Sequence, residues 1–167
     1  MSTFEVKVHK IFHPIVKHPN ADSLDLIKIM DYVCIANRLE DGSPRYKVGD
    51  YVIYVPVGAV VPDYLLKPGF WNEEKNIGYL SGSKGNIVKE KKLRDIFSQG
   101  ILFGVRKIDA LGITSYAIFN DAGESMVVED GQDVAEFLGI TKYEPPVLPL
   151  LLQTYLFEIE YYQNSCN

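Results

Sequence analysis

A short basic segment in the middle of the chain carries residue types that bind phosphate. KEKKLRDIFSQG, at residues 89–100, places four cationic side chains within six positions and ends in a Ser-Gln-Gly turn. Ammonium and guanidinium groups attract phosphate oxygens, and hydroxyl and amide groups can donate to phosphate or ribose. The candidate phosphate-binding residues are Lys84, Lys89, Lys91, Lys92, Arg94, Ser98 and Gln99.

The charge around this segment differs from that of the rest of the chain. The 167-residue protein has a formal net charge of −5, which argues against a surface coated with cations. Residues 80–107 nevertheless carry seven cations and two acids, whereas residues 108–167 carry ten acids and one lysine. Any contact with a polyanion must therefore be local. The alternative is that these lysines protect an exposed strand edge from aggregation.

Histidine and cysteine offer little metal or redox chemistry. On a strand, the spacing of His9 and His13 separates them by roughly 13 Å, which is too far to share a metal ion. The chain has two cysteines, Cys34 and Cys166, which are too few for a disulfide framework. We therefore expect no metal site, and a reducing location such as the cytoplasm.

Aromatic residues near the basic segment could stack on bases, because a flat π face accepts any base. The candidates are Trp71, Phe70, Tyr79 and Phe103, and Phe103 is the one that we assign to the nucleic-acid-binding site. The alternative is that these rings cover the mouth of a barrel.

The elements that would position these residues are mostly strands. Alternating apolar residues predict one strand at 4–8, and a second begins at residue 24 and continues to 36. A mostly buried strand ends at Pro56. The remaining predictions are a turn at 18–22, a strand across 86–94, strands near 101–105, 115–120 and 125–130, and helical turns at 63–66 and 133–138. This pattern predicts a mainly β fold, a small antiparallel barrel with elaborated loops and short helices.

The C-terminal segment, residues 147–167, is apolar. Its longest apolar run is about half the length needed to span a bilayer, and it contains Pro149 and Gln153. Apolar residues recur at roughly helical spacing, which predicts a C-terminal helix packed on the barrel or on a partner subunit, and no membrane span. A homo-oligomer formed through this tail is one expectation.

Two motifs resemble a known nucleic-acid module. HPNADSL, starting at His18, followed much later by KLRDIFSQGIL, is similar to the tRNA-binding OB domain attached to several aminoacyl-tRNA synthetases. The resemblance implies a five-stranded OB-fold barrel in which the first motif joins two strands. Within that turn, His18 is the residue we expect to touch a ligand.

A longer resemblance runs from about residue 4 to Pro146. YVPVGAVVP, Trp71, GYLSGSKGN, KLR, SQGIL and FLGITKYEPP follow one another as in the N-terminal OB module of the Deinococcus-type RNA ligases, the fifth RNA ligase family. In that family the module precedes an ATP-dependent nucleotidyltransferase domain, and the enzyme seals RNA nicks. The resemblance implies a role in RNA repair.

The chain departs from this family in two respects. The nucleotidyltransferase lysine opens a Lys-x-Asp-Gly or Lys-Thr-Asp-Glu motif, whereas Leu39 and Val128 stand at that position before the two Asp-Gly pairs of this chain. Asp95 replaces the glycine usual after Lys-Leu-Arg and adds a negative charge to the patch.

These observations support one hypothesis about the function of the chain and leave one alternative. Residues 1–146 are expected to form an OB-fold module that binds RNA or an RNA-containing duplex, and 147–167 a separate tail. We expect no catalytic residue and no activity of the chain alone, with ATP and a divalent metal belonging to a separate nucleotidyltransferase domain or subunit. The alternative is a protein-interaction or oligomerisation module that uses the aromatic loop and the apolar tail.

Overall fold

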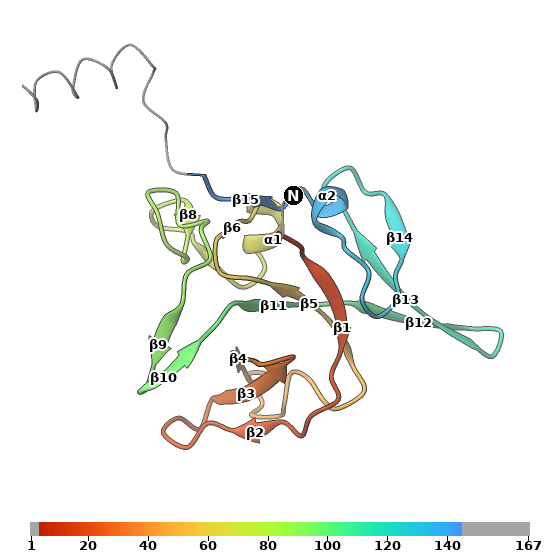
Figure 1. Cartoon of the computed structure of the whole chain (residues 1–167), viewed down its shortest axis with the longest axis horizontal. Helices are drawn as coiled ribbons and strands as arrows, with labels where there is room; N and C mark the ends of the chain where they lie inside the picture. Colours follow the sequence, from red (N-terminus) through yellow and green to blue (C-terminus); the bar gives the residue numbers. More distant parts are fainter. Residues whose placement is uncertain (1–3, 145–167) are drawn as a thin grey trace, which may run out of the picture.

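The computed structural model describes residues 4–144, most of which lie in short β-strands or the turns between them. Two short helices accompany the strands in this range, so the predicted mainly β fold is confirmed (Figure 1). In chain order the elements are β1 (Lys7–Lys10), β2 (Val16–Lys17), β3 (Leu24–Ile29), β4 (Tyr32–Asn37), β5 (Tyr51–Val55), β6 (Ala59–Val60), α1 (Asp63–Leu66), β7 (Trp71–Asn72), β8 (Ile77–Gly78), β9 (Lys91–Leu93), β10 (Ile96–Ser98), β11 (Ile101–Gly104), β12 (Arg106–Ala110), β13 (Ile113–Phe119), β14 (Ser125–Val127), α2 (Ala135–Leu138) and β15 (Thr141–Lys142).

Strand β5 is the centre of the fold because it is paired on both edges and buried on both faces. It pairs antiparallel with β1 on one edge and with β11 on the other. Its side chains alternate, so that Val52 and Tyr54 enter one core while Ile53 and Val55 enter another. The predicted buried strand ending at Pro56 is therefore confirmed.

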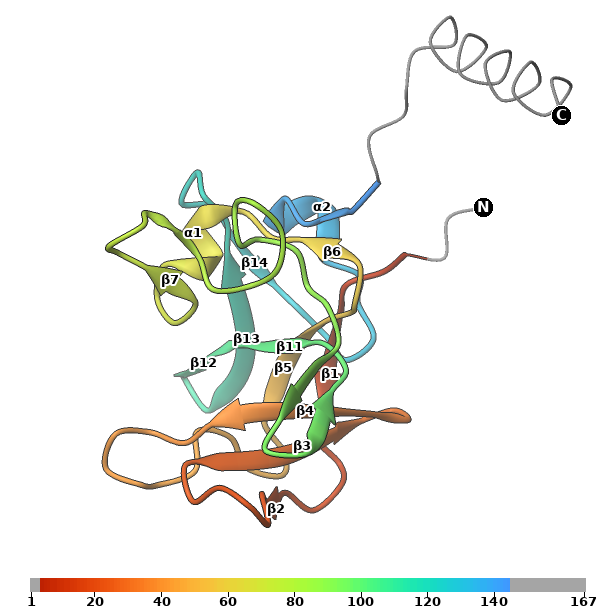
Figure 2. The same ribbon diagram turned by 90° about the vertical axis from the view of Figure 1, so that its left-hand side faces the viewer.

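The smaller core lies between the sheet β1-β5-β11 and the sheet β2-β3-β4. Both Figure 1 and Figure 2 draw β2, β3 and β4 as a layer beneath β5 and β11. Burial in this core raises the pKa of the Cys34 thiol to about 12, so the thiol stays protonated and serves as packing. The buried members are Ile11, Ile27, Ile29, Cys34, Val52, Tyr54 and Leu102.

The larger core lies on the other face of β5, and both helices pack into it. Helix α1 contributes Leu66 and occupies the predicted residues 63–66. Helix α2 contributes Leu138 and is followed by Gly139, whose φ of 79° ends the helix as the sequence indicated. The predicted C-terminal helix falls at 147–167, outside the described residues.

The second strand predicted from the sequence is in fact a hairpin. Ile29 of β3 lies opposite Tyr32 of β4, so that only two residues form the turn between the strands. Met30, the first of them, adopts a left-handed φ of 53°. The turn allows the two halves to pair with each other, which satisfies backbone groups that a single strand of that length would leave open.

A second hairpin, β12–β13, was only partly predicted. The sequence indicated a strand near 115–120, but not β12, whose five residues are all exposed. Because neither face of β12 is buried, its sequence has no alternating pattern to reveal it. No helix within residues 4–144 is long and apolar enough to cross a membrane.

Candidate nucleic-acid interface

The basic segment forms a two-stranded hairpin, β9–β10, whose register sorts its side chains onto two faces. Lys92 lies opposite Phe97 on one face. On the other face Lys91 lies opposite Ser98. The same alternation puts Leu93 and its partner Ile96 on this second face. A strand across 86–94 was expected, but the paired region is shorter and begins at Lys91. The hairpin therefore has one face open to solvent and one face anchored through Ser98, although Lys91 on this second face is itself exposed.

The solvent face presents a cation above an exposed aromatic ring. The Lys92 ammonium lies 5.7 Å from the centroid of the Phe97 ring, and Phe97 is 50% exposed. This pair joins a phosphate-binding group to a flat apolar surface. Phe97 was not among the residues predicted from the sequence. Its signal was the alternation across Ile96, Phe97 and Ser98, in which the middle residue faces away from its neighbours.

The anchored face is tied to β4 by polar groups. Ser98 is buried, and its hydroxyl accepts the Ile35 N–H at 3.0 Å and donates to the Gly100 carbonyl at 3.1 Å. The Gln99 N–H donates to the Val33 carbonyl at 2.8 Å, and the Gln99 side-chain oxygen accepts the Val33 N–H at 3.1 Å. These bonds fix the hairpin base against the sheet, so Ser98 positions the hairpin and has no free face for RNA.

The HPN turn at residues 18–20 holds the hairpin tip. His18 is only 2% exposed, and its Nδ1 accepts the Asn20 N–H at 3.0 Å. Nε2 must then carry the proton of the neutral ring, and it donates to the Leu93 carbonyl at 2.9 Å. The Asn20 side-chain amide donates to the Arg94 carbonyl, also at 2.9 Å. We call His18 and Asn20 the clamp. The expected contact of His18 with a ligand is therefore revised: both ring nitrogens are used within the protein.

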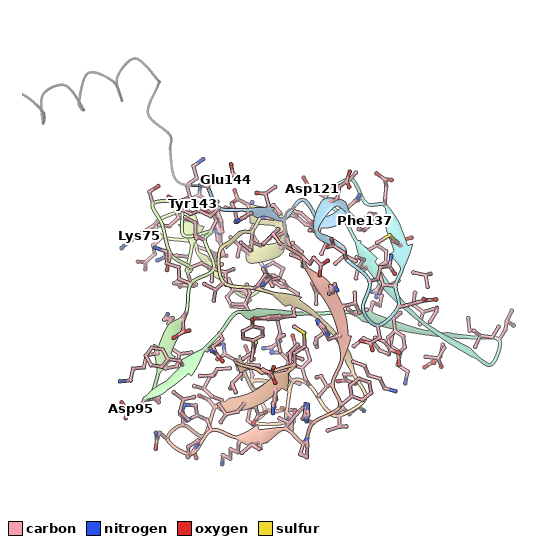
Figure 3. The ribbon with its side chains drawn as sticks, in the orientation of Figure 1. Lys75, Asp95, Asp121, Phe137, Tyr143 and Glu144 are labelled. Carbon is pink, nitrogen blue, oxygen red and sulfur yellow. The ribbon has the colours of Figure 1, made fainter. Side chains whose placement is uncertain are left out.

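The turn to which the clamp bonds contains no glycine. Arg94 and Asp95 have φ values of 50° and 73°, the left-handed conformations of a two-residue hairpin turn. Such conformations cost roughly 1 kcal/mol or more at a residue with a Cβ. The two clamped carbonyls belong to Leu93 and Arg94, directly at this turn. Figure 3 shows Asp95 at the outer end of the hairpin.

The remaining predicted residues fall in different places. Lys89, Lys91, Lys92 and Arg94 are all exposed in and next to the hairpin. Lys84 is exposed in the loop after β8, where its carbonyl accepts the Gly78 N–H. Phe103 instead packs on the larger core, 5.7 Å from Phe70 in an edge-to-face contact. Two further cations of the basic stretch lie in β12, on the opposite side of the molecule from β9 and β10 (Figure 1).

The hairpin cations are not neutralised by the acidic part of the chain that the structure describes. Among residues 4–144, the ion pairs are Lys7 with Glu5, Lys17 with Asp22, Arg38 with Asp25 and Lys92 with Asp95. The last spans 4.0 Å between two exposed side chains, where screening leaves little energy. No acid from 108–144 pairs with a hairpin cation, so the positive charge of the hairpin faces solvent.

The described residues contain no group of three or more His, Cys, Asp or Glu side chains placed to hold a metal ion. The hairpin itself presents exposed cationic side chains beside an exposed aromatic ring.

Comparison with known proteins finds tRNA ligase subunits that are similar in sequence and an RNA ligase that is similar in structure. No family model matches the sequence. The phenylalanine–tRNA ligase beta subunit of Geobacter metallireducens is 31% identical over 145 residues, which cover 78% of this chain and 17% of that subunit. The corresponding subunit of Geobacter sulfurreducens is 32% identical over 105 residues, 58% of this chain and 12% of the subunit. The chain thus spans less than a fifth of the length of these relatives.

Solved structures with the same fold belong to an RNA ligase. Naegleria gruberi RNA ligase with PPi superposes with a TM-score of 0.57 at 19% identity, covering 88% of this chain and 37% of the ligase. A mutant of the same ligase with AMP and Mn gives a TM-score of 0.55 at 22% identity, covering 85% and 36%. The chain therefore shares its fold with about a third of an RNA ligase.

Proposed function

We propose that this chain is an RNA-binding module built on a five-stranded OB-type barrel. Support comes from the strand neighbours around the smaller core: β2–β3–β4 on one side, β11–β5–β1 on the other. β1 runs into β2, and the segment after β10 bonds to β4 through Gln99. A five-stranded OB-type barrel is the fold that the resemblance to the Deinococcus-type RNA ligases implies. Residues 1–146 form the module in this proposal, and residues 147–167 a tail.

The observation that carries the proposal is the clamped, solvent-facing cationic hairpin. Lys89, Lys91, Lys92 and Arg94 contact backbone phosphates, Phe97 stacks on a base, and the clamp keeps them in place. Such contacts position a strand without reading its sequence, because phosphates are the same at every nucleotide. The two kinds of relatives, an RNA ligase and a tRNA ligase subunit, support RNA or an RNA-containing duplex as the partner.

The proposed context is an accessory half of an RNA-joining enzyme. No residue of the chain is assigned a catalytic role, and Ser98 and Phe103 become supporting residues. In this proposal ATP and a divalent metal act in a nucleotidyltransferase domain outside residues 1–167, in a reducing compartment such as the cytoplasm. Incubation with radiolabelled ATP and Mg²⁺ tests this: we expect no covalent nucleotide adduct on this chain, and an adduct would overturn the assignment.

RNA binding itself is tested by fluorescence anisotropy with a labelled single-stranded RNA of about 12 nucleotides, the span of one or two OB sites. We expect the wild-type chain to bind and the quadruple variant K89A/K91A/K92A/R94A to lose at least about a hundredfold in affinity at low salt. The variant F97A should lose about tenfold, because a stacked base is worth roughly 1–3 kcal/mol. Equal affinity of all three proteins would refute the proposal.

A second function, protein interaction, is favoured by one separate observation. Leu111 is fully exposed and Ile113 is 69% exposed at the tip of β12–β13, a surface with no use in RNA binding. Of the aromatic loop, Tyr79 is exposed, whereas Trp71 is half-buried under Lys67. Light scattering of the full chain and of a variant truncated after Pro146 tests this function. A stable oligomer that dissociates on truncation, together with negligible RNA affinity, would favour it over RNA binding.

A further inference from the structure

A groove of about 330 Å³ lies outside the hairpin, and its lining residue Tyr54 bonds to Gln99 directly after β10. Residues of β1, the β3–β4 turn, β5 and β15 line it, among them Lys7, His9, Met30, Tyr32 and Lys142. The volume falls at the lower end of the range for small-molecule sites, roughly 300–1,000 Å³. It is thus large enough for one nucleotide and too small for a folded partner.

A rigid aromatic platform forms one wall of the groove. The Tyr32 ring stacks on the Tyr54 ring with centroids 5.6 Å apart and planes 12° apart. Tyr54 is buried, while Tyr32 is 44% exposed. Because Tyr54 covers one face of the Tyr32 ring, the exposed area belongs to the other face and the edge. A ring supported from behind loses little freedom when a base stacks on its open face.

Polar groups border this platform. The His9 ring lies edge-on to Tyr54 at 6.2 Å. Burial lowers the pKa of His9 more than the nearby Asp130 raises it, so the ring is neutral at pH 7 and can both donate and accept a hydrogen bond. Lys7 pairs with Glu5 at 2.9 Å, and Lys142 adds a second cation on the same lining. The lining therefore carries one more positive than negative charge, which suits a single phosphodiester.

The platform is joined to the end of the hairpin. The Tyr54 hydroxyl donates to the Gln99 carbonyl at 2.5 Å, and burial raises its pKa, so it remains a donor at all physiological pH values. Gln99 follows Phe97 by two residues, roughly 7 Å along an extended chain. A strand that stacks on Phe97 is therefore within a few nucleotides of Tyr32.

We propose that this groove is a second nucleotide subsite, in which Tyr32 stacks on one base of the RNA strand held by the hairpin. Lys142 and Lys7 lie near the phosphate of that nucleotide, and His9 bonds to the edge of the base. The inference rests on the proposed RNA binding, and it adds an anchor that the basic segment alone does not provide. The free nucleotide and a base within a strand share the same chemistry, so the test separates them.

The affinity test compares Tyr32→Ala and Tyr32→Phe with the wild-type chain on the same single-stranded RNA. We expect Tyr32→Ala to weaken binding about tenfold and Tyr32→Phe to leave it within about twofold, because the ring and not the hydroxyl makes the stack. Tyr79→Ala is the matched control, since Tyr79 is an exposed tyrosine, 60% against 44% for Tyr32, outside both the groove and the hairpin. A loss for Tyr79→Ala as large as for Tyr32→Ala would overturn the proposal.

Photocrosslinking locates the contact. RNA containing 5-iodouridine should crosslink to the peptide that contains Tyr32, and the crosslink should disappear in the presence of excess unlabelled RNA but persist with excess uridine monophosphate. Competition by the mononucleotide at low concentration would mean a free-nucleotide site and would overturn the strand version.

The outcomes separate this proposal from the function on which it rests. If the wild-type chain binds RNA and the quadruple hairpin variant does not, but Tyr32→Ala binds normally and no crosslink forms at Tyr32, the subsite is refuted and the hairpin interface stands. If the wild-type chain does not bind RNA at all, the proposed function fails first.

Discussion

The two surface hairpins have similar turns but differ in what holds their tips. In β12–β13, Leu111 and Gly112 form the two-residue turn with φ values of 53° and 77°, and the glycine adopts its conformation at little cost. In β9–β10, Arg94 and Asp95 adopt comparable φ values without a glycine. The His18 and Asn20 side chains, from a turn distant in sequence, bond to the backbone carbonyls at this tip.

The two tips are specified at different levels. The β12–β13 tip is specified locally, by residues within the hairpin, and nothing in the described residues uses its exposed apolar side chains. The β9–β10 tip depends on contacts across more than 70 residues of sequence. A protein gains from such long-range support where the position of surface charges matters, which is why we place the RNA contacts on β9–β10.

Removing two cations from each hairpin should change RNA affinity far more at β9–β10 than at β12–β13. K91A/K92A should lower RNA affinity by about tenfold or more, whereas R106A/K107A, which removes the same charge from β12, should lower it by less than about threefold. Anisotropy at one salt concentration measures both. Equal losses would mean that RNA responds only to the total charge and that the hairpin has no special role.

The next effect concerns the clamp. His18→Ala leaves the Leu93 carbonyl and the Asn20 N–H without their partner and opens a cavity, so we expect the free energy of unfolding to fall by about 2–3 kcal/mol. RNA affinity should fall as well, because the tip loses its position. His13→Ala, at an exposed histidine of the same segment, should change stability by less than about 0.5 kcal/mol.

Urea denaturation and anisotropy on the folded proteins provide the two readings. Normal RNA affinity in a folded His18→Ala protein would show that the clamp is not needed to position the hairpin.

A smaller effect on stability is expected when glycine is introduced at the β9–β10 tip and removed from the β12–β13 tip. Asp95→Gly relieves the left-handed conformation and should raise the free energy of unfolding by about 0.5–1 kcal/mol, while Gly112→Ala should lower it by a similar amount. Asp95→Asn removes the charge but keeps a side chain. Both Asp95 variants should bind RNA more tightly, since a carboxylate leaves the patch, but only the glycine variant should gain stability. Chemical denaturation of all three decides this.

The smallest effect is expected at the apolar tip. Leu111→Ser should leave both the free energy of unfolding and the RNA affinity unchanged, because the fully exposed side chain contacts nothing that the structure describes. A change of oligomeric state in light scattering would be the exception, and it would favour the protein-interaction function.

The sequence predicted the parts of the fold that depend on local pattern. The buried strand ending at Pro56, the helical turn at 63–66 and the glycine stop after α2 all follow from periodicity and turn chemistry. The β3–β4 hairpin and β12 were missed. Met30 carries no turn signal, and β12 has no buried face. Both depend on pairing with a neighbour, which local pattern does not record.

Charge alone indicated which segment forms the candidate site. The sequence did not reveal the contacts that hold this segment in place. The run of lysines identified one exposed segment as the candidate interface, but it did not show that His18 and Ser98 are buried. Nor did it reveal Phe97 or Tyr32, whose roles come from the register of a hairpin and the stacking of two rings. Those facts depend on contacts between residues far apart in the sequence.

The salt dependence of RNA affinity, measured for the wild-type chain and for K89A/K91A/K92A/R94A, tests directly whether β9–β10 binds phosphates. Released counterions give a slope of about −0.7 per neutralised phosphate on a single strand, so the wild-type slope of log affinity against log salt should be about −2 to −3. The quadruple variant should show a slope no steeper than about −0.7, the contribution of the one phosphate contact that remains in the groove. Parallel lines for the two proteins, or a flat line for the wild-type chain, would contradict the assignment of this hairpin as the phosphate-binding surface.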